Sequence, residues 1–466
     1  MLFSSLPFLF YFLPTVLLLY FIVPKSFKNI VLLVSSLFFY GWGEPKYLAL
    51  MIVSILMGYI FGLLIEKNAD NNKSKVFVII SVACSLLILG YFKYADFFIH
   101  SFNSITGLSI PFLKISLPVG ISFYTFQIIS YTIDIYKGQI RAQKNIITLA
   151  AYIAMFPQLI AGPIIRYIDI ENQLTDRYHS LAKTSEGIKR FTIGLAKKVL
   201  LANLLGEVVF HYTVTADVSV LYSWLSALCY SLQIFFDFSG YSDMAIGLGK
   251  IFGFDFMENF DYPFISKTVT EFWRRWHISL GQWFKDYLYI PLGGNRVSKV
   301  RWLINIFIVW FATGFWHGAS YNFILWGLFY GFLLVIEKIF TYDFFNNHSI
   351  IGHFYVILIT IFGFVLFNAT DLFNLSIQLS NMFGLSDIPL ISDETTYYLR
   401  SYRSIITIAL LASTPLFKDI IAKVKENNTA KFIIDIIEPV VYIFLFIITV
   451  SYLIDGSFNP FLYFRF

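Results

Sequence analysis

The sequence predicts an all-α protein that crosses a membrane many times, and three observations support that prediction. The 466 residues are 58% hydrophobic and only 14% charged, whereas soluble domains carry about 25% charged residues. The mean hydropathy is +0.70, and the apolar residues form long continuous runs without alternation. Because backbone groups in lipid must be hydrogen-bonded internally, continuous runs of this kind predict helices and not a barrel of strands.

The apolar runs set the expected number of helices. They lie near residues 6–23, 29–42, 47–65, 76–94, 117–136, 146–165, 188–210, 218–236, 241–256, 302–316, 320–340, 352–373, 403–417 and 432–454. A membrane-spanning helix needs about 20 residues, so the shorter runs predict re-entrant segments buried in protein. We therefore expect a single integral-membrane domain over 1–466 with about 11 to 14 transmembrane and re-entrant helices.

The cationic residues indicate orientation in a bilayer. The run from Leu6 to Val23 has no cationic start and is followed by Lys25 and Lys28, which favours a first span over a cleavable signal peptide. The net charge of +5 comes from cations in short loops between apolar runs. This distribution predicts contact with membrane lipid and does not predict a nucleic-acid partner.

The segment 271–290 is too charged to span but is rich in tryptophan. Its aromatic and apolar residues recur at intervals of three and four, at Trp273, Trp276, Leu280, Trp283 and Tyr287. This spacing predicts one amphipathic helix with an aromatic face. His277 falls at the edge of that face, where its ring could reach a water-filled cavity. The alternative is an interfacial anchor in which the histidine has no function.

A second histidine, His317, follows the apolar run that begins near Trp302. Gly314 and Gly318 flank it, and small residues of this kind let helices approach closely and leave room for a substrate. A titratable ring at membrane depth is costly and marks a functional site by default. A neutral imidazole there can act as a general base. The alternative is an interhelical hydrogen bond.

A polar run, Phe236–Asp243, separates two apolar stretches. Asp237, Ser239 and Tyr241 supply polar groups at membrane depth, which predicts a polar cavity or a helix break. The alternative is a tight turn between two spans, with Asp243 capping the next helix. Elsewhere the sequence has no metal signature, no glycine-rich phosphate loop and no nucleophile elbow. It therefore predicts no metal ion and no tightly bound cofactor.

Taken together, these motifs resemble the membrane-bound O-acyltransferase (MBOAT) family. The matching stretches are Pro118–Gln127, Phe156–Pro163, Phe235–Asp243, Glu271–His277 and Gly314–Gly318. Within that family, the stretches Lys285–Arg296 and Asn459–Phe466 look like the bacterial branch of the alginate O-acetyltransferase membrane subunit. The D-alanyl transferases of teichoic acid synthesis resemble the chain around both histidines.

The resemblance implies a fold and a set of site residues. It implies a ring of tilted helices around a central tunnel, with peripheral helices over 1–115, a catalytic core over 116–340 and further helices over 341–466. His317 corresponds to the family's invariant histidine and His277 to its second histidine, so both are catalytic candidates. The candidates for the tunnel or the donor site are Gln127, Asp237, Ser239, Tyr241, Arg274, Arg275, Lys285 and Trp316.

The expected activity is O-acyl transfer in a bacterial cell membrane. The acyl group, taken to be acetyl, would pass from a cytoplasmic thioester such as acetyl-CoA to a hydroxyl of an extracytoplasmic polysaccharide. The immediate acceptor could instead be a serine of an exported SGNH-type acetyltransferase partner. One alternative is D-alanyl transfer from a carrier protein to teichoic acid. Another is transport of a glycan or acyl carrier, against which the missing internal repeat counts.

Overall fold

A computed structural model describes residues 1–160 and 162–456, and every regular element in this part of the chain is a helix. Ala161, within one of the family-like stretches, and the C-terminal stretch Asn459–Phe466 lie outside the described residues. The chain forms two compact units, one of Met1–Phe191 with Met244–Met257 and one of Thr192–Asp243 with Glu258–Phe466. The subdivision at residues 115 and 340 remains a prediction.

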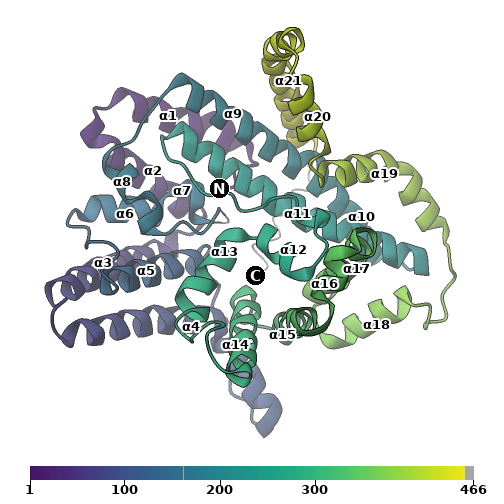
Figure 1. Ribbon diagram of the computed structural model, residues 1–466, viewed down its shortest axis with the longest axis horizontal. Helices are drawn as coiled ribbons and strands as arrows, with labels where there is room; N and C mark the ends of the chain where they lie inside the picture. Colours follow the sequence, from purple (N-terminus) through teal and green to yellow (C-terminus); the bar gives the residue numbers. More distant parts are fainter. Residues whose placement is uncertain (161, 457–466) are drawn as a thin grey trace. The chain divides into compact units, whose positions relative to one another are not determined.

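The first unit contains the N-terminal helices. They are η1 (Phe8–Phe12), α1 (Leu13–Ile22), η2 (Lys25–Phe27), α2 (Lys28–Gly43), η3 (Pro45–Tyr47), α3 (Leu48–Lys67), α4 (Lys73–Thr106), α5 (Ile121–Tyr136), α6 (Ile146–Ala154), α7 (Phe156–Leu159) and α8 (Tyr167–Thr175). Helices α3, α4 and α5 pack side by side (Figure 1). Nearly every residue of α5 is buried, including the polar Ser122, Gln127 and Asp134, so this helix lies in the interior of the first unit.

The second unit contains most of the remaining helices. They are η4 (Lys197–Asn203), α10 (Leu204–Val214), η5 (Pro263–Ile265), α12 (Val269–Arg275), α13 (Ile278–Phe284), η6 (Lys285–Tyr289), α14 (Lys299–His317), α15 (Tyr321–Ile336), η7 (Glu337–Thr341), α16 (Tyr342–Asn347), α17 (Ser349–Asn368), α18 (Leu372–Met382), α19 (Asp393–Ala412), α20 (Leu416–Val424) and α21 (Asn428–Asp455). Two long helices, α9 (Leu181–Ala196) and α11 (Val220–Ile251), contribute residues to both units.

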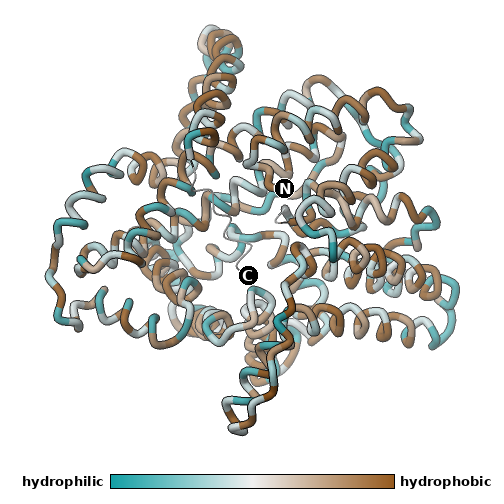
Figure 2. Tube along the Cα trace, turned by 180° about the vertical axis from the view of Figure 1, so that it is seen from behind, coloured by the Kyte–Doolittle hydropathy of each residue, from teal (hydrophilic) through white to brown (hydrophobic). Residues whose placement is uncertain are grey.

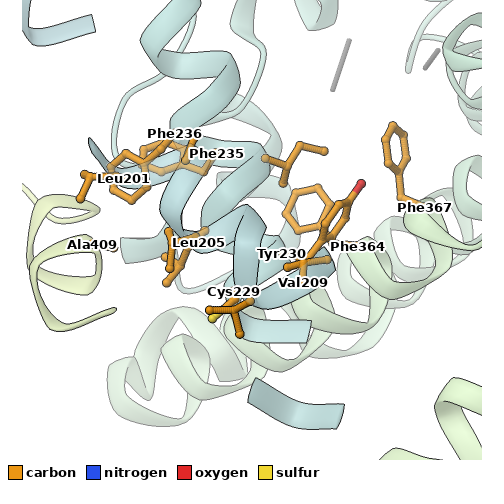
Figure 3. Packing of buried hydrophobic residues seen from close by; sticks show 14 of the residues in the cluster. Leu201, Leu205, Val209, Cys229, Tyr230, Phe235, Phe236, Phe364, Phe367 and Ala409 are labelled. Atoms are coloured by element: carbon orange, nitrogen blue, oxygen red, sulfur yellow. The ribbon is translucent and has the colours of Figure 1, made fainter. Parts of the chain in front are cut away.

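The core of the second unit is rich in aromatic residues. It joins α10, α11, α12, α15, α17 and α19 through buried side chains that include Phe236, Trp276, Trp326 and Phe364. Figure 3 shows part of this cluster, with Leu205 and Cys229 among its smaller members. The functional histidine candidates lie on elements of this same unit.

Five described helices are long and apolar enough to cross a membrane. They are Pro45–Lys67, Lys73–Thr106, Tyr321–Asn347, Ser349–Asn368 and Asn428–Asp455. The bent pair α19 and α20 gives a sixth if it forms one span. The apolar composition of α21 is visible as a largely brown tube in Figure 2. The chain is thus an all-α polytopic membrane protein, as predicted, while the central tunnel remains a prediction.

The predicted break or turn at Phe236–Asp243 is wrong, because α11 runs through this segment without interruption. Both carboxylates are paired with lysines of η4: Lys198 Nζ lies 2.7 Å from Asp237 Oδ1, and Lys197 Nζ lies 2.7 Å from Asp243 Oδ2. Gly240 permits the close approach, since a Cβ atom there would lie 2.7 Å from the Gly194 carbonyl oxygen. Ion pairing therefore lets the charged residues remain in a continuous helix.

The predicted single helix over 271–290 is also wrong. Helix α12 ends at Arg275, Trp276 is extended, and α13 begins only at Ile278. Between them, His277 has the left-handed backbone angles φ 46° and ψ 53°, which non-glycine residues seldom adopt. The aromatic periodicity identified Trp276, Leu280 and Trp283 as buried, whereas Trp273 and Tyr287 are only partly buried. It did not reveal that the helix is interrupted at the histidine.

Candidate functional site

His277 is held at the break by an upstream segment that runs beside it. The Ile278 N–H donates to the Asn259 carbonyl oxygen at 3.0 Å, and the Asp261 N–H donates to the Arg275 carbonyl oxygen at 2.9 Å. These two bonds satisfy backbone groups that the interruption of the helix would otherwise leave without partners. The irregular backbone around His277 is therefore supported on both sides.

The Asn259 side chain is fully buried and contacts the same turn. Its Oδ1 atom accepts hydrogen bonds from the Ser279 N–H at 3.2 Å and from the Ser279 hydroxyl at 2.8 Å. The same oxygen lies 3.2 Å from Nδ1 of His277. Its amide nitrogen donates to the Ser242 hydroxyl on α11 at 3.1 Å. Asn259 thus links the histidine to a long helix of the core.

His277 lines a cavity of about 610 Å³ in the second unit. Its wall includes two cations, Arg274 and Lys285, and the carboxylate of Asp286. The apolar part of the wall comes from α12, α13, α14 and α15, with Trp273, Trp276, Leu280, Phe284, Ile306, Val309, Trp310 and Leu334. A mostly apolar pocket with a few polar groups is typical of a small-molecule site. The two cations would favour an anionic ligand.

Burial keeps the His277 ring in its neutral form. Only 2% of the residue is exposed, and desolvation lowers the pKa of His277 well below its ordinary value. The neighbouring His317 lowers the pKa of His277 further. Because a neutral imidazole has one nitrogen that donates and one that accepts, the ring can accept a hydrogen bond or a proton at neutral pH.

His317 is the last residue of α14 and is surrounded by aromatic rings. Its ring centroid lies 5.0 Å from that of Trp316, 5.1 Å from that of Trp326 and 5.3 Å from that of Phe367. The side chain is buried, with 8% of the residue exposed. This environment has the apolar character that the sequence indicated for His317.

Two glycines bring α14 and α15 together one turn before His317. A Cβ atom at Gly314 would lie 2.2 Å from the Phe323 carbonyl oxygen, and one at Gly327 would lie 2.2 Å from the Trp310 carbonyl oxygen. Backbone atoms cannot move aside as side chains can, so only glycine allows this crossing. The crossing places Trp326 of α15 against His317.

Trp316 connects the two histidines. Its ring centroid lies 6.2 Å from that of His277 and 5.0 Å from that of His317. The two candidates, which are far apart in sequence, are therefore neighbours across one indole ring. Thr313, one helical turn before His317, lines the same cavity as His277.

Several other predicted site residues lie on different helices and do not line this cavity. Arg275 lies next to Arg274 in sequence, but it pairs with Glu271 at 3.0 Å and with Asp261 at 2.9 Å and does not line the cavity. Asp237, Ser239 and Tyr241 are buried on α11 and do not line the cavity either. Gln127 is buried on α5 in the first unit. The donor-site role of these residues remains a prediction.

Two residues of the site were not identified from the sequence. Asn259 lies 18 positions before His277, in a segment without a recognisable motif. Glu337 accepts hydrogen bonds from the Val269 N–H at 2.6 Å and the Thr270 N–H at 2.9 Å, and so caps the N-terminus of α12. The only sequence feature that could have identified Glu337 is its charge near the end of the apolar run 320–340. No group of three His, Cys, Asp or Glu side chains within 1–160 and 162–456 could hold a metal ion.

Comparison with known proteins gives a consistent result. Residues 137–370 match the model of MBOAT, the membrane-bound O-acyltransferase family. The chain is 39% identical to a Pseudomonas putida protein named probable alginate O-acetylase AlgI, over the whole of both chains. It is 44% identical to the Pseudomonas syringae protein of the same name, covering 83% of this chain and 76% of the relative.

A third relative is named for a different polymer, peptidoglycan. The Helicobacter pylori peptidoglycan O-acetyltransferase is 34% identical, over 90% of this chain and 87% of the relative. All three relatives are bacterial and are named for O-acetylation, and the matched region includes both histidines. The chain therefore belongs to the membrane-bound O-acyltransferase (MBOAT) family, in the alginate O-acetylase branch, and is a multi-pass O-acyltransferase of a bacterial membrane.

Proposed function

We propose that this enzyme transfers an acetyl group from cytoplasmic acetyl-CoA, through a tunnel in the membrane, to a hydroxyl on the outer side. The acceptor is an extracytoplasmic polysaccharide, or a serine of an exported SGNH-type acetyltransferase that then modifies the polysaccharide. The names of the relatives support a glycan acceptor, since they specify alginate and peptidoglycan. The observation that carries the proposal is the pairing of His277 and His317 across Trp316, beside a cavity with two cations.

In this reaction His317 acts as the general base. A ring nitrogen takes the proton of the acceptor hydroxyl while the oxygen bonds to the acyl carbon of the thioester. The carbon–sulfur bond then breaks, and the proton passes to the departing thiolate, so that the products are an ester and a free thiol. Positioned general-base catalysis typically contributes about 100- to 10,000-fold to the rate.

His277 acts on the donor side, where it orients the thioester. The apolar wall of its cavity suits the acyl and pantetheine portions of the donor, and Arg274 and Lys285 suit its phosphates. Arg is well matched to phosphate because its planar guanidinium can donate two hydrogen bonds at once. This cavity is therefore assigned to the donor and not to the glycan.

The test is covalent chemistry by the purified protein in nanodiscs. With acetyl-CoA and either alginate or peptidoglycan fragments, with and without the exported partner, the wild type should release free thiol and label the acceptor. His317→Ala should remain folded and lose about 100-fold or more of this activity. His100→Ala, which changes an exposed histidine on α4, serves as the matched control and should retain activity.

Three outcomes would contradict the proposal. Acceptor labelling by His317→Ala at the wild-type rate would remove the general base. Labelling from a D-alanyl carrier protein, and not from acetyl-CoA, would favour the teichoic-acid alternative. Movement of an intact glycan across the bilayer without thiol release would favour transport.

A further inference from the structure

The Asn259 amide has a defined orientation. One of its two side-chain termini faces the backbone N–H of Ser279 at 3.2 Å. A backbone N–H can only donate, so the atom that faces it must be the amide oxygen. The opposite terminus, Nδ2, is then a donor, and it lies 3.1 Å from the Ser242 hydroxyl. Both contacts agree with the same orientation of the amide.

This orientation determines which nitrogen of His277 carries the proton. Nδ1 of His277 lies 3.2 Å from the same amide oxygen, which is an acceptor. An unprotonated Nδ1 would place two lone pairs against each other, whereas a protonated Nδ1 donates a hydrogen bond. In a neutral ring the lone pair is then on Nε2.

The hydroxyl of Ser279 also lies near Nδ1 of His277 and could compete with Asn259 as its partner. It lies 3.5 Å from Nδ1 but 2.8 Å from the Asn259 oxygen. The shorter contact is within the usual range for a hydroxyl donor, and the longer one is beyond it. The hydroxyl proton is therefore directed to Asn259, and Asn259 is left as the acceptor for Nδ1–H.

We propose that Asn259 is a positioning residue that fixes His277 in the tautomer protonated at Nδ1, with Nε2 as the hydrogen-bond acceptor. The functional part of this proposal rests on the donor-side role proposed for His277. In that role Nε2 accepts a hydrogen bond from an amide N–H of the acyl donor, a group that the pantetheine arm supplies. A histidine in the opposite tautomer would present a donor to that amide.

The tautomer can be measured without any assay of activity. Protein labelled with ¹⁵N-histidine in nanodiscs would give long-range ¹H–¹⁵N spectra, in which the His277 signals are those missing from His277→Gln. The wild type should show a protonated Nδ1 and a bare Nε2. Asn259→Leu removes the acceptor and should give a mixture of tautomers, whereas Asn259→Asp keeps an acceptor and should retain the protonated Nδ1.

Two further variants separate Asn259 from its neighbours. Ser242→Ala removes the other hydrogen bond of the amide but leaves its oxygen in place, so Nδ1 should stay protonated. Ser279→Ala removes only the competing hydroxyl and should also leave Nδ1 protonated. A wild-type ring protonated at Nε2 would overturn the proposal. So would a tautomer that changes in Ser279→Ala but not in Asn259→Leu.

Kinetics then test the functional part. Asn259→Leu should raise KM for acetyl-CoA about tenfold with a smaller change in kcat, because an interaction made in both ground and transition states is lost. Asn259→Asp should restore much of the lost affinity. If His277→Gln were fully active, the donor-side role would fail, while the spectra would still decide whether Asn259 sets the tautomer.

Discussion

The α14–α15 hairpin and the segment 259–285 each position one histidine, and they do so by different means. In the hairpin, two glycines allow backbone-to-backbone contact, and His317 is placed by rings packed around the end of a regular helix. In the segment, the backbone is irregular, and His277 and its neighbours are placed by the hydrogen bonds that they donate to Asn259. The first arrangement depends on shape, and the second depends on polar partners.

The difference agrees with the roles proposed for the two residues. Helix packing defines the direction of a side chain within a narrow range, which suits a base that must meet a reacting hydroxyl. A side-chain hydrogen bond to one ring nitrogen can also set the tautomer of a neutral histidine, which suits a residue that recognises a donor. The two histidines should therefore respond to different kinds of substitution.

Breaking the hairpin should have the largest effect. Gly314→Ala places a Cβ atom 2.2 Å from the Phe323 carbonyl oxygen, so α14 and α15 must separate. Overpacking of this kind typically costs about 1–3 kcal/mol or more, and we expect a lower melting temperature in detergent and loss of acyl transfer. Gly90→Ala in α4 is the control, since nothing lies within 4 Å of its Cβ position. If Gly314→Ala and Gly90→Ala had the same melting temperature, α14 and α15 would not be in backbone contact at Gly314.

Removing Arg274 and Lys285, the two cations of the cavity, should have the next largest effect. It should weaken the binding of acetyl-CoA and leave folding unchanged. Arg274→Ala with Lys285→Ala should raise KM for acetyl-CoA about tenfold, equivalent to about 1.4 kcal/mol, and the difference should shrink at high salt. Arg275→Ala is the matched comparison, because Arg275 is paired with Glu271 and Asp261. It should lower the melting temperature and leave KM unchanged. If Arg275→Ala raised KM for acetyl-CoA more than the double variant did, the assignment of the cavity to the donor would be wrong.

The two regions also differ in how well the sequence predicts them. Continuous apolar runs predicted α14, α15, α17 and α21, because a helix in lipid is determined by local composition. The break at His277 depends on Asn259, and the continuity of α11 depends on Lys197 and Lys198. These partners come from other elements, so no periodicity within one segment could reveal them. The catalytic roles of both histidines remain predictions that rest on chemistry and on family resemblance.

Weakening the hydrogen bonds between Glu337 and the N-terminus of α12 should have the smallest effect. Glu337 of η7 accepts hydrogen bonds from the Val269 and Thr270 N–H groups and so anchors α12, which carries Arg274 and leads into His277. Glu337→Gln keeps one acceptor oxygen and replaces the other with a donor, so only one of the two N–H groups loses its acceptor. We expect a modest fall in melting temperature and a few-fold loss of activity. The exposed Glu426→Gln is the control. If Glu337→Gln matched it in both measurements, the bonds to Glu337 would contribute nothing to the position of α12, which would then depend on the aromatic contacts of Trp273 and Trp276 and on the ion pairs of Arg275.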